Sequence, residues 1–209
     1  GGVPLRNTQM AYGGITEHQS RSGLERASAN GVKFINLSPQ KKDMPETVNG
    51  EWVSLRPGTD TAVMLGIAYV LEKEGLADRA FLAAYTVGYD RFRSYLLGDE
   101  DGIAKDASWA SAISNVAASE ITSLARKMAT KRTFISLAWS LQRADHGEQP
   151  YWMAVTLACM LGAIGRRGGG FGFGYGAEGY IGSDWRRFNW ANFPKSYNPT
   201  RFAIPVSRI

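Results

Sequence analysis

The widest range of polar side chains in the chain lies in residues 137–153, LAWSLQRADHGEQPYWM, directly after an apolar run. The segment holds two tryptophans, an arginine, a glutamate, two glutamines and one of the two histidines. Arg143 can pair with a phosphate or a polar heterocycle through several planar donors, and Trp139 can stack on a flat ring. Taken singly, Arg143 is equally a surface charge and His146 a satisfied turn histidine. Together these residue types favour a large, planar, charged ligand.

Two further polar positions extend this interpretation. Ser38 follows an apolar run at 32–37, where its hydroxyl can reach a ribose. Asp60 stands at the start of a predicted helix, where a carboxylate can accept the paired N–H donors of a guanine edge and where a helix N-terminus favours an anion. Simpler interpretations are a strand exit before Pro39 and a helix cap at Thr59 or Asp60. As a set, the positions describe a nucleotide cradle.

The segments that must position these residues alternate between helical and extended patterns. The apolar runs 32–37 (VKFINL) and 132–139 (RTFISLAW) predict two buried strands. The polar stretch 38–58 holds three prolines and predicts an irregular loop with one short extended segment around Trp52. Helices are predicted over residues 17–30, 59–75, 78–85, 89–98, 106–114, 119–129 and 148–165.

A glycine-rich segment follows the last predicted helix, which Gly165 is expected to end. From Gly168 to Gly182, eight of fifteen residues are glycine, which predicts a loop. Fixing such a backbone costs about 1–2 kcal/mol per residue. We therefore expect residues 166–182 to be disordered or displaced unless a cofactor or neighbouring domain covers their aromatic side chains.

The alternation predicts an α/β fold, a parallel-sheet dinucleotide-binding-like domain with several short helices and a glycine-rich C-terminal loop region. Both predicted strands are apolar on both faces, as in a parallel sheet that is covered on both sides. Strands 32–37 and 132–138 are expected to share one sheet. Because ligands bind beyond the carboxyl ends of such strands, Ser38 and Trp139 should open at the same edge.

Composition excludes several classes of site. The net charge is +5 and the isoelectric point about 9.4, which favours anionic ligands. Cys159 is the single cysteine, so an intrachain disulfide and any multi-cysteine zinc or iron–sulfur site are excluded. No apolar run reaches membrane-spanning length. Neither GxGxxG after a strand nor GxxxxGK[ST] occurs, so ordinary NAD and ATP sites are poorly supported.

Five segments, in order, resemble the molybdopterin oxidoreductases of the dimethyl sulfoxide reductase type, with trimethylamine N-oxide and biotin sulfoxide reductases among them. The family usually has Asn-Pro where this chain has Val3-Pro4, and Asn-Pro or Asp-Pro where it has Ser38-Pro39. The resemblance covers nearly the whole chain, and its fourth segment is long and specific. The segments are VPLRNTQ, FINLSP, LRPGTDTAVMLGIAYVL, WSLQRADHGEQPYWMAVTLACMLGAIGRRGGGFGFGY and FAIPVSRI.

The resemblance implies a molybdenum enzyme with two molybdopterin guanine dinucleotides, which removes oxygen from an S-oxide or N-oxide with two electrons and two protons. Residues 1–209 would be a fragment of one dinucleotide-binding α/β domain, with 165–209 as a glycine- and aromatic-rich extended tail. Its partners would be the remaining domains of the same chain, a small oxide substrate and an electron-donor protein. Neither nucleic acid nor membrane insertion is expected. The periplasm is slightly favoured over the cytoplasm, and the fragment alone should be inactive.

The resemblance also implies particular site residues, which the family uses to contact cofactor or substrate. Trp139 and Arg143 would line the pterin and substrate funnel and act in catalysis, and Ser140 lies beside them. In those reductases the metal-binding serine lies upstream of this region, so Ser140 is not the expected ligand and the chain should contain no metal ligand. The other cofactor-binding residues would be Arg6, Asn7, Leu37, Ser38, Gly58, Thr59, Asp60, His146 and Gln149.

Two alternatives remain. The segments GRRGGGFGFGYG and YIGSDWRRFNW interleave arginine, glycine and aromatics, as single-stranded RNA-binding arms do. Against this, the arginines gather at 166–167 and 186–187 instead of repeating, and no RNA-binding signature precedes them. The second alternative is a family member that has lost catalysis and serves as a structural subunit.

Overall fold

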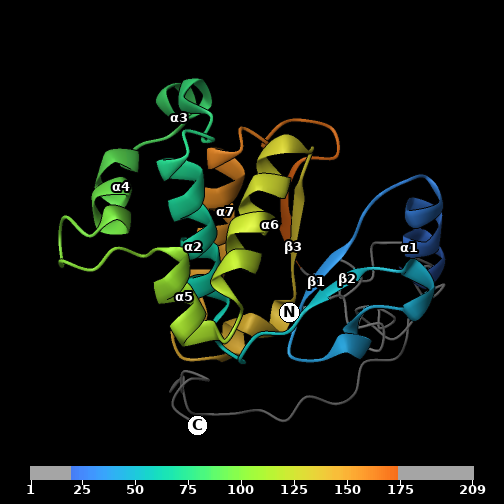
Figure 1. Cartoon of the computed structure of the whole chain (residues 1–209). Helices are drawn as coiled ribbons and strands as arrows, with labels where there is room; N and C mark the ends of the chain where they lie inside the picture. The colour runs from blue at the N-terminus through green and yellow to red at the C-terminus, as the bar shows by residue number, and fades with distance from the viewer. Residues whose placement is uncertain (1–19, 174–209) are drawn as a thin grey trace, which may run out of the picture.

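The computed structural model describes residues 20–173, and all structural statements below concern this part of the chain. It folds as an α/β unit of helices with short parallel strands (Figure 1), which confirms the predicted class. In chain order the elements are α1 (Ser20–Ala29), β1 (Ile35–Leu37), η1 (Lys41–Asp43), η2 (Glu46–Val48), β2 (Glu51–Val53), α2 (Asp60–Lys73), α3 (Arg79–Tyr85), α4 (Tyr89–Leu97), α5 (Ala107–Ser114), α6 (Ala118–Thr130), β3 (Phe134–Leu137), η3 (Trp139–Arg143), α7 (Gln149–Met160) and β4 (Gly170–Phe173).

The strands form two separate parallel pairs. In one pair Ile35 of β1 lies opposite Glu51 of β2, and in the other Phe134 of β3 lies opposite Gly170 of β4. The expectation that strands 32–37 and 132–138 share one sheet is therefore wrong for the described residues. The extended segment around Trp52 returns beside β1, and the chain after α7 returns beside β3, so β1 pairs with β2 and β3 pairs with β4. Nor is β3 covered on both sides, because Phe134 is 45% exposed.

The glycine-rich segment contains a strand. The loop predicted over 168–182 is wrong at β4, and residues 174–182 lie outside the described range. Glycine and phenylalanine alternate in β4, with Gly170 and Gly172 buried and Phe173 49% exposed. That period of two is the pattern of a strand with one covered face. The abundance of glycine concealed this alternation.

The predicted helices are confirmed, with one shorter than expected. Helix α7 ends at Met160 and not at Gly165. The chain reverses at Gly162, whose φ is 56°, in the left-handed region that favours glycine. The Met160 carbonyl lies at the helix end, where carbonyls have no partner within the helix, and it accepts the Asp78 N–H at 2.7 Å. The end of α7 is thus set by its contact with the chain that leads into α3.

Helix α2 forms the centre of the core, with α5, α6 and α7 around it (Figure 1). It is apolar on nearly every side, as expected of a helix that others surround. Its Gly66 permits an especially close approach to α5, because a Cβ there would lie 2.7 Å from the Cβ of Ala110. No helix of the described chain is long and apolar enough to cross a membrane.

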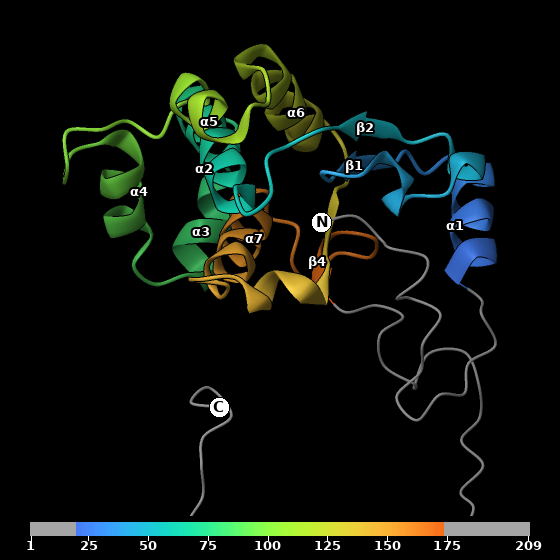
Figure 2. The same cartoon turned by 90° about the horizontal axis from the view of Figure 1, so that it is seen from below.

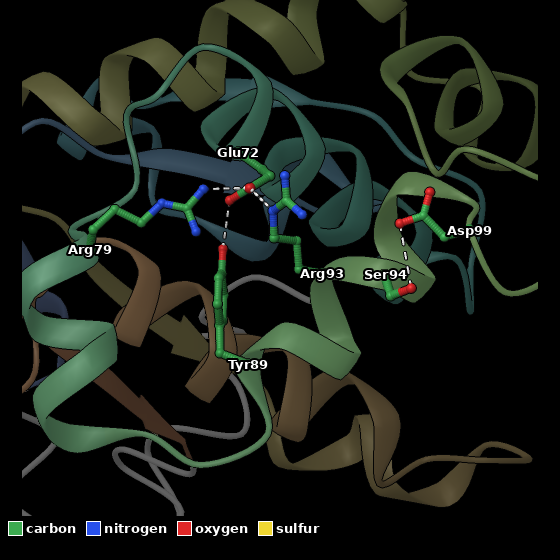
Figure 3. A network of polar contacts seen from close by, with 6 residues as sticks. All are labelled: Glu72, Arg79, Tyr89, Arg93, Ser94 and Asp99. Carbon is green, nitrogen blue, oxygen red and sulfur yellow. Dashed lines mark hydrogen bonds and ion pairs between the residues drawn. The ribbon is translucent and has the colours of Figure 1, made fainter.

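A buried carboxylate fastens α3 and α4 to α2. Glu72, whose side chain is 2% exposed, accepts hydrogen bonds from Arg79 (2.5 Å), from the Tyr89 hydroxyl (2.8 Å) and from Arg93, as Figure 3 shows. We call these four residues the Glu72 cluster. Burial alone would raise the pKa of Glu72, but the hydrogen bonds from Arg93, Tyr89 and Arg79 outweigh it and hold this pKa below its ordinary value. Burial and the bond to Glu72 raise the pKa of Tyr89.

Residues 20–53 form an N-terminal lobe at one side of the helices, as Figures 1 and 2 agree. Within the lobe, the Ser28 hydroxyl donates to the Val48 carbonyl at 3.0 Å and joins α1 to η2. Val53 belongs to the main core, and Ile35 and Leu37 pack against it. The Lys127–Glu51 ion pair at 2.8 Å links α6 to β2 on the surface.

Candidate functional site: a groove at the start of α2

A groove of about 480 Å³ lies where α2 begins. One wall is the first turn of α2, a second is the loop between η3 and α7, and a third is made by α4 and α5. It brings together five predicted site residues from two distant segments, Gly58, Thr59 and Asp60 on one side and His146 and Gln149 on the other. The remaining lining residues are Thr61, Ala62, Leu65, Tyr95, Trp109, Ile113, Leu141, Ala144, Asp145, Gly147 and Pro150.

The α2 wall offers backbone donors. Gly58 has a φ of 76°, which turns the chain into the helix, and the Thr59 hydroxyl donates to the Arg56 carbonyl at 2.6 Å. Thr59 occupies the N-cap position, but its side chain makes no capping hydrogen bond. Asp60 is the first helical residue and not the cap. Because the first N–H groups of a helix have no partner within it, this turn is suited to an anion.

The opposite wall is a tight loop that carries His146. His146 has a φ of 54°, rare for a residue with a side chain, and is 79% exposed. Its Nε2 lies 3.9 Å from Asp145 Oδ2 and its Nδ1 lies 3.8 Å from Glu148 Oε1. The pKa of Glu148 is lowered by hydrogen bonds from the Glu148 backbone N–H and from the Gln149 side chain, and by the nearby His146. The loop thus presents carboxylates and an imidazole at one side of the groove.

Gly147 lets this loop fold back on η3. A Cβ at Gly147 would lie 2.5 Å from the Gln142 carbonyl oxygen and 2.7 Å from its Cα, both of them backbone atoms. The Gly147 N–H donates to the Ala144 carbonyl at 3.0 Å. A larger residue would force the loop that carries His146 and Gln149 to move.

The third wall is aromatic and was missed in the sequence. Asp106 accepts the Trp109 N–H at 2.7 Å and so fixes the first turn of α5. Trp109 and Ile113 stand four residues apart and therefore lie on one face of α5, with Tyr95 of α4 beside them in the groove. The spacing of Trp109 and Ile113 was visible in the sequence. Nothing in the sequence indicated that α4 would return to the start of α2.

Ser38 does not line the groove. It is fully buried, its hydroxyl donates to the Asp43 carboxylate, and it accepts the Gln40 N–H at 3.2 Å. Its carbonyl accepts the indole N–H of Trp52 at 2.9 Å. Leu37, half-buried beside it, packs against the core and is also absent from the groove. A contact of Ser38 with ribose stays a prediction that would require this hydroxyl to exchange partners.

Trp139, Ser140 and Arg143 lie on η3, directly after β3, and are exposed outside the groove lining. The Trp139 ring meets Phe173 of β4 edge-on, with 5.8 Å between centroids. The Tyr151 hydroxyl lies 2.8 Å from the Trp139 carbonyl and 3.0 Å from that of Ala138, and donates to this pair. Burial raises the pKa of Tyr151, so the phenol keeps its proton. These contacts hold η3 against α7 and β4.

Two predicted residues, Arg6 and Asn7, lie outside the described residues. Within residues 20–173, no group of three or more histidine, cysteine, aspartate or glutamate side chains is arranged to hold a metal ion. The groove lining combines two carboxylates, Asp60 and Asp145, with His146 and aromatic side chains, and these groups suit an organic ligand with N–H donors.

The chain is similar to a known family and to several of its members. It matches the family of molybdopterin oxidoreductases over residues 10–195. It is 42% identical to biotin sulfoxide reductase of Cereibacter sphaeroides over all of this chain and 28% of that protein. It is 46% identical to dimethyl sulfoxide/trimethylamine N-oxide reductase of Rhodobacter capsulatus, over 84% of this chain and 21% of that protein. It is 43% identical to trimethylamine-N-oxide reductase of Haemophilus influenzae, over 82% of this chain and 21% of that protein.

Among solved structures, acetylene hydratase from Pelobacter acetylenicus aligns with a TM-score of 0.58 over 77% of this chain and 24% of that one. At 20% identity this likeness concerns the fold alone. The chain spans between a fifth and somewhat over a quarter of the length of the curated relatives described above. The RNA-binding interpretation finds no support among these matches.

Proposed function

The chain belongs to the molybdopterin oxidoreductase family, and on that premise we propose that its groove holds the guanine end of a molybdopterin guanine dinucleotide. The full-length protein would be a molybdenum reductase of S-oxides or N-oxides. The substrate class is proposed from the relatives, which are biotin sulfoxide, dimethyl sulfoxide and trimethylamine N-oxide reductases. The family implies a molybdenum–molybdopterin cofactor, and the dinucleotide form is our proposal.

The groove fits a nucleotide in size and chemistry. Small-molecule sites of roughly 300–1,000 Å³ that combine apolar walls with a few polar groups are typical, and this groove holds about 480 Å³. The first turn of α2 suits an anionic group, and the carboxylate of Asp60 suits the N–H edge of guanine. Aromatic residues occupy the wall beside them. The single observation that carries the proposal is this meeting of Asp60 with an aromatic wall in one groove.

The bound molybdenum centre would supply oxygen-atom transfer with two electrons and two protons. The described residues would bind and orient its organic part. Trp139 and Arg143, on η3 beyond the groove loop, would line the pterin and substrate funnel, with Ser140 beside them. Arg143 offers planar donors to a heterocycle or phosphate. Trp139 offers a ring that meets Phe173 edge-on, and its backbone carbonyl accepts the Tyr151 hydroxyl.

The rest of the enzyme completes the proposal. A second dinucleotide and the metal-ligand residue would come from parts of the protein beyond this chain, because the chain covers only 28% of the biotin sulfoxide reductase it matches. Those parts would also receive the electron-donor protein. A periplasmic location is proposed over a cytoplasmic one.

Asp60→Asn in the full-length enzyme tests the guanine role. The amide replaces one acceptor oxygen with a donor facing the guanine N–H groups, which removes a charge-assisted hydrogen bond of roughly 1.5–3 kcal/mol. We expect less guanosine monophosphate to be released per protein on acid treatment, with the thermal midpoint little changed. The matched control is Asp90→Asn, an exposed aspartate in the first turn of α4 that does not line the groove. Normal nucleotide content in the Asp60 variant would contradict the proposal.

A further inference from the structure

Lys105 is a lysine buried behind an aromatic ring. Its side chain is 3% exposed, which is rare for lysine. Its Nζ donates to Asp101 Oδ2 at 2.6 Å and to the Ile103 carbonyl at 2.5 Å, and it lies 4.3 Å from the centroid of the Tyr95 ring. The hydrogen bond from Lys105 and that from the Ile103 N–H lower the pKa of Asp101, which keeps the carboxylate charged. The ammonium group is therefore held against Tyr95 by two fixed oxygen atoms.

The chain around Lys105 is fixed as well. The Lys105 N–H donates to the Leu96 carbonyl at 3.0 Å, and Leu96 is fully buried. Gly98 has a φ of 88°, and a Cβ there would lie 2.7 Å from the Ala104 nitrogen, so the turn after α4 is tightly closed. The link between position 105 and Leu96 is thus made by the backbone and not by the lysine side chain.

Tyr95 contacts the lysine through its ring and also lines the groove. Tyr95 lines the groove, whereas Lys105 does not and is almost wholly covered. Trp109 lines the same groove from α5, its backbone N–H held by Asp106 at 2.7 Å. A cation on the covered face of a ring draws π density toward itself and leaves the open face better suited to an electron-rich partner. A purine is such a partner.

On the basis of the proposed function, we propose that Tyr95 is the stacking residue for the nucleotide base and that Lys105 is its positioning residue. Trp109 closes the same wall. Burying an ammonium group is unfavourable unless paired charge and hydrogen bonds offset it, and a methionine would fill the same space without that penalty. A role for the Lys105 ammonium in orienting the Tyr95 ring and favouring its contact with the base explains why a charged residue occupies this position. This assigns base recognition to two parts of the groove, with Asp60 at the edge of the base and Tyr95 at its face.

The test uses full-length protein purified without cofactor and titrated with guanosine monophosphate. Hydrogen exchange of the peptide covering residues 109–117 reports on this groove, because it contains the lining residues Trp109 and Ile113. In Tyr95→Leu the midpoint of protection should rise roughly tenfold to a hundredfold, since stacking of a base on an aromatic ring is lost. Tyr95→Phe keeps the ring and should stay within about twofold of the parent protein. Lys105→Met should raise the midpoint with the ring still present.

The matched control is Tyr85→Leu, a tyrosine of α3 that is 75% exposed and does not line the groove. Thermal midpoints of all variants separate folding from binding. If Tyr95→Leu fails to fold, Lys105→Met decides, because a merely structural lysine would change thermal stability and leave the nucleotide midpoint where it was. An unchanged midpoint in Tyr95→Leu or Lys105→Met overturns the assignment while the guanine site stands. Absence of any protection by the nucleotide in the parent protein overturns the guanine site and this inference together.

Discussion

Gly66 of α2 and Ala110 of α5 approach so closely that a Cβ on Gly66 would lie 2.7 Å from the Ala110 Cβ. The same added atom would lie 3.2 Å from the Ile121 side chain of α6. This contact sets the distance between the helix that carries Asp60 and the helix that carries Trp109. The groove depends on that spacing.

Gly66→Ala should therefore destabilise the protein by about 1–3 kcal/mol through overpacking, although alanine favours a helix by about 1 kcal/mol. The control is Gly23→Ala, in the middle of α1, where an added Cβ meets nothing within 4 Å. That variant should be slightly stabilised. The measurement is the urea midpoint of each full-length variant. Equal midpoints would show that α2 and α5 can move apart without loss of stability.

Glu72→Gln should destabilise the protein at neutral pH by roughly 1.5–3 kcal/mol, because Arg79 and Arg93 lose a charged acceptor. Both guanidinium groups are about half exposed, which favours the lower part of this range. The measurement is urea unfolding at pH 7. The control is Glu74→Gln, whose pair with Arg126 lies on the surface and should matter little.

The Glu72 carboxylate also makes the free energy of unfolding sensitive to acid. The pKa of Glu72 is lower in the folded state than its ordinary value of 4.5, so its contribution is fully present above that value and is lost as the pH falls through the folded value. Between pH 5 and pH 3, the parent protein should lose stability more steeply than Glu72→Gln. If both proteins lose stability equally between pH 5 and pH 3, Glu72 is not the group responsible for the acid sensitivity.

Gly147→Ala should displace the groove loop, since the new Cβ would meet the backbone of Gln142. His146 and Gln149 move with that loop, so the full-length variant should bind less cofactor. Molybdenum and nucleotide content per protein provide the measurement. Gly23→Ala again serves as the control, and full cofactor content in Gly147→Ala would mean that the loop wall is not part of the site.

Phe173→Leu should lower turnover with only a modest effect on stability. The substitution removes ring contacts with Trp139 and Tyr151, whose centroids lie 5.8 and 5.5 Å away, each worth about 0.5–1.5 kcal/mol. A less restrained Trp139 would orient the pterin and substrate poorly. Steady-state turnover of an S-oxide checks this, with Phe134→Leu, at the opposite end of the β3–β4 pair, as the control. Unchanged turnover in Phe173→Leu would show that the position of the Trp139 ring does not affect the reaction.

The helices could be predicted because each has a clear local pattern, as in α2, where an apolar run follows a polar N-terminal turn. Strand pairing could not. The runs at 32–37 and 132–139 look alike, and nothing local shows that β1 pairs with Glu51–Val53 or that β3 pairs with Gly170–Phe173. Parallel partners are chosen by the covering helices and by the paths of the connections, which are tertiary properties.

The groove was predicted in part for a similar reason. Local chemistry and the family resemblance indicate five site residues that do lie around one groove, namely Gly58, Thr59, Asp60, His146 and Gln149. The sequence does not mark Tyr95 and Trp109 as site residues, because an aromatic residue on a short helix is usually a core residue. Their place in the groove follows from the close approach at Gly66 and from the return of α4 to the start of α2.

The N-terminal lobe meets the helices through a small set of contacts, chiefly Val53 with the flanking Ile35 and Leu37, and the exposed Lys127–Glu51 pair. A two-stranded pair has little stability of its own. The lobe should therefore open at a lower free energy than the helices around α2, as a separate cooperative unit in native-state hydrogen exchange. A site built on α2, α4 and α5 would stay formed while the lobe opens and closes beside it.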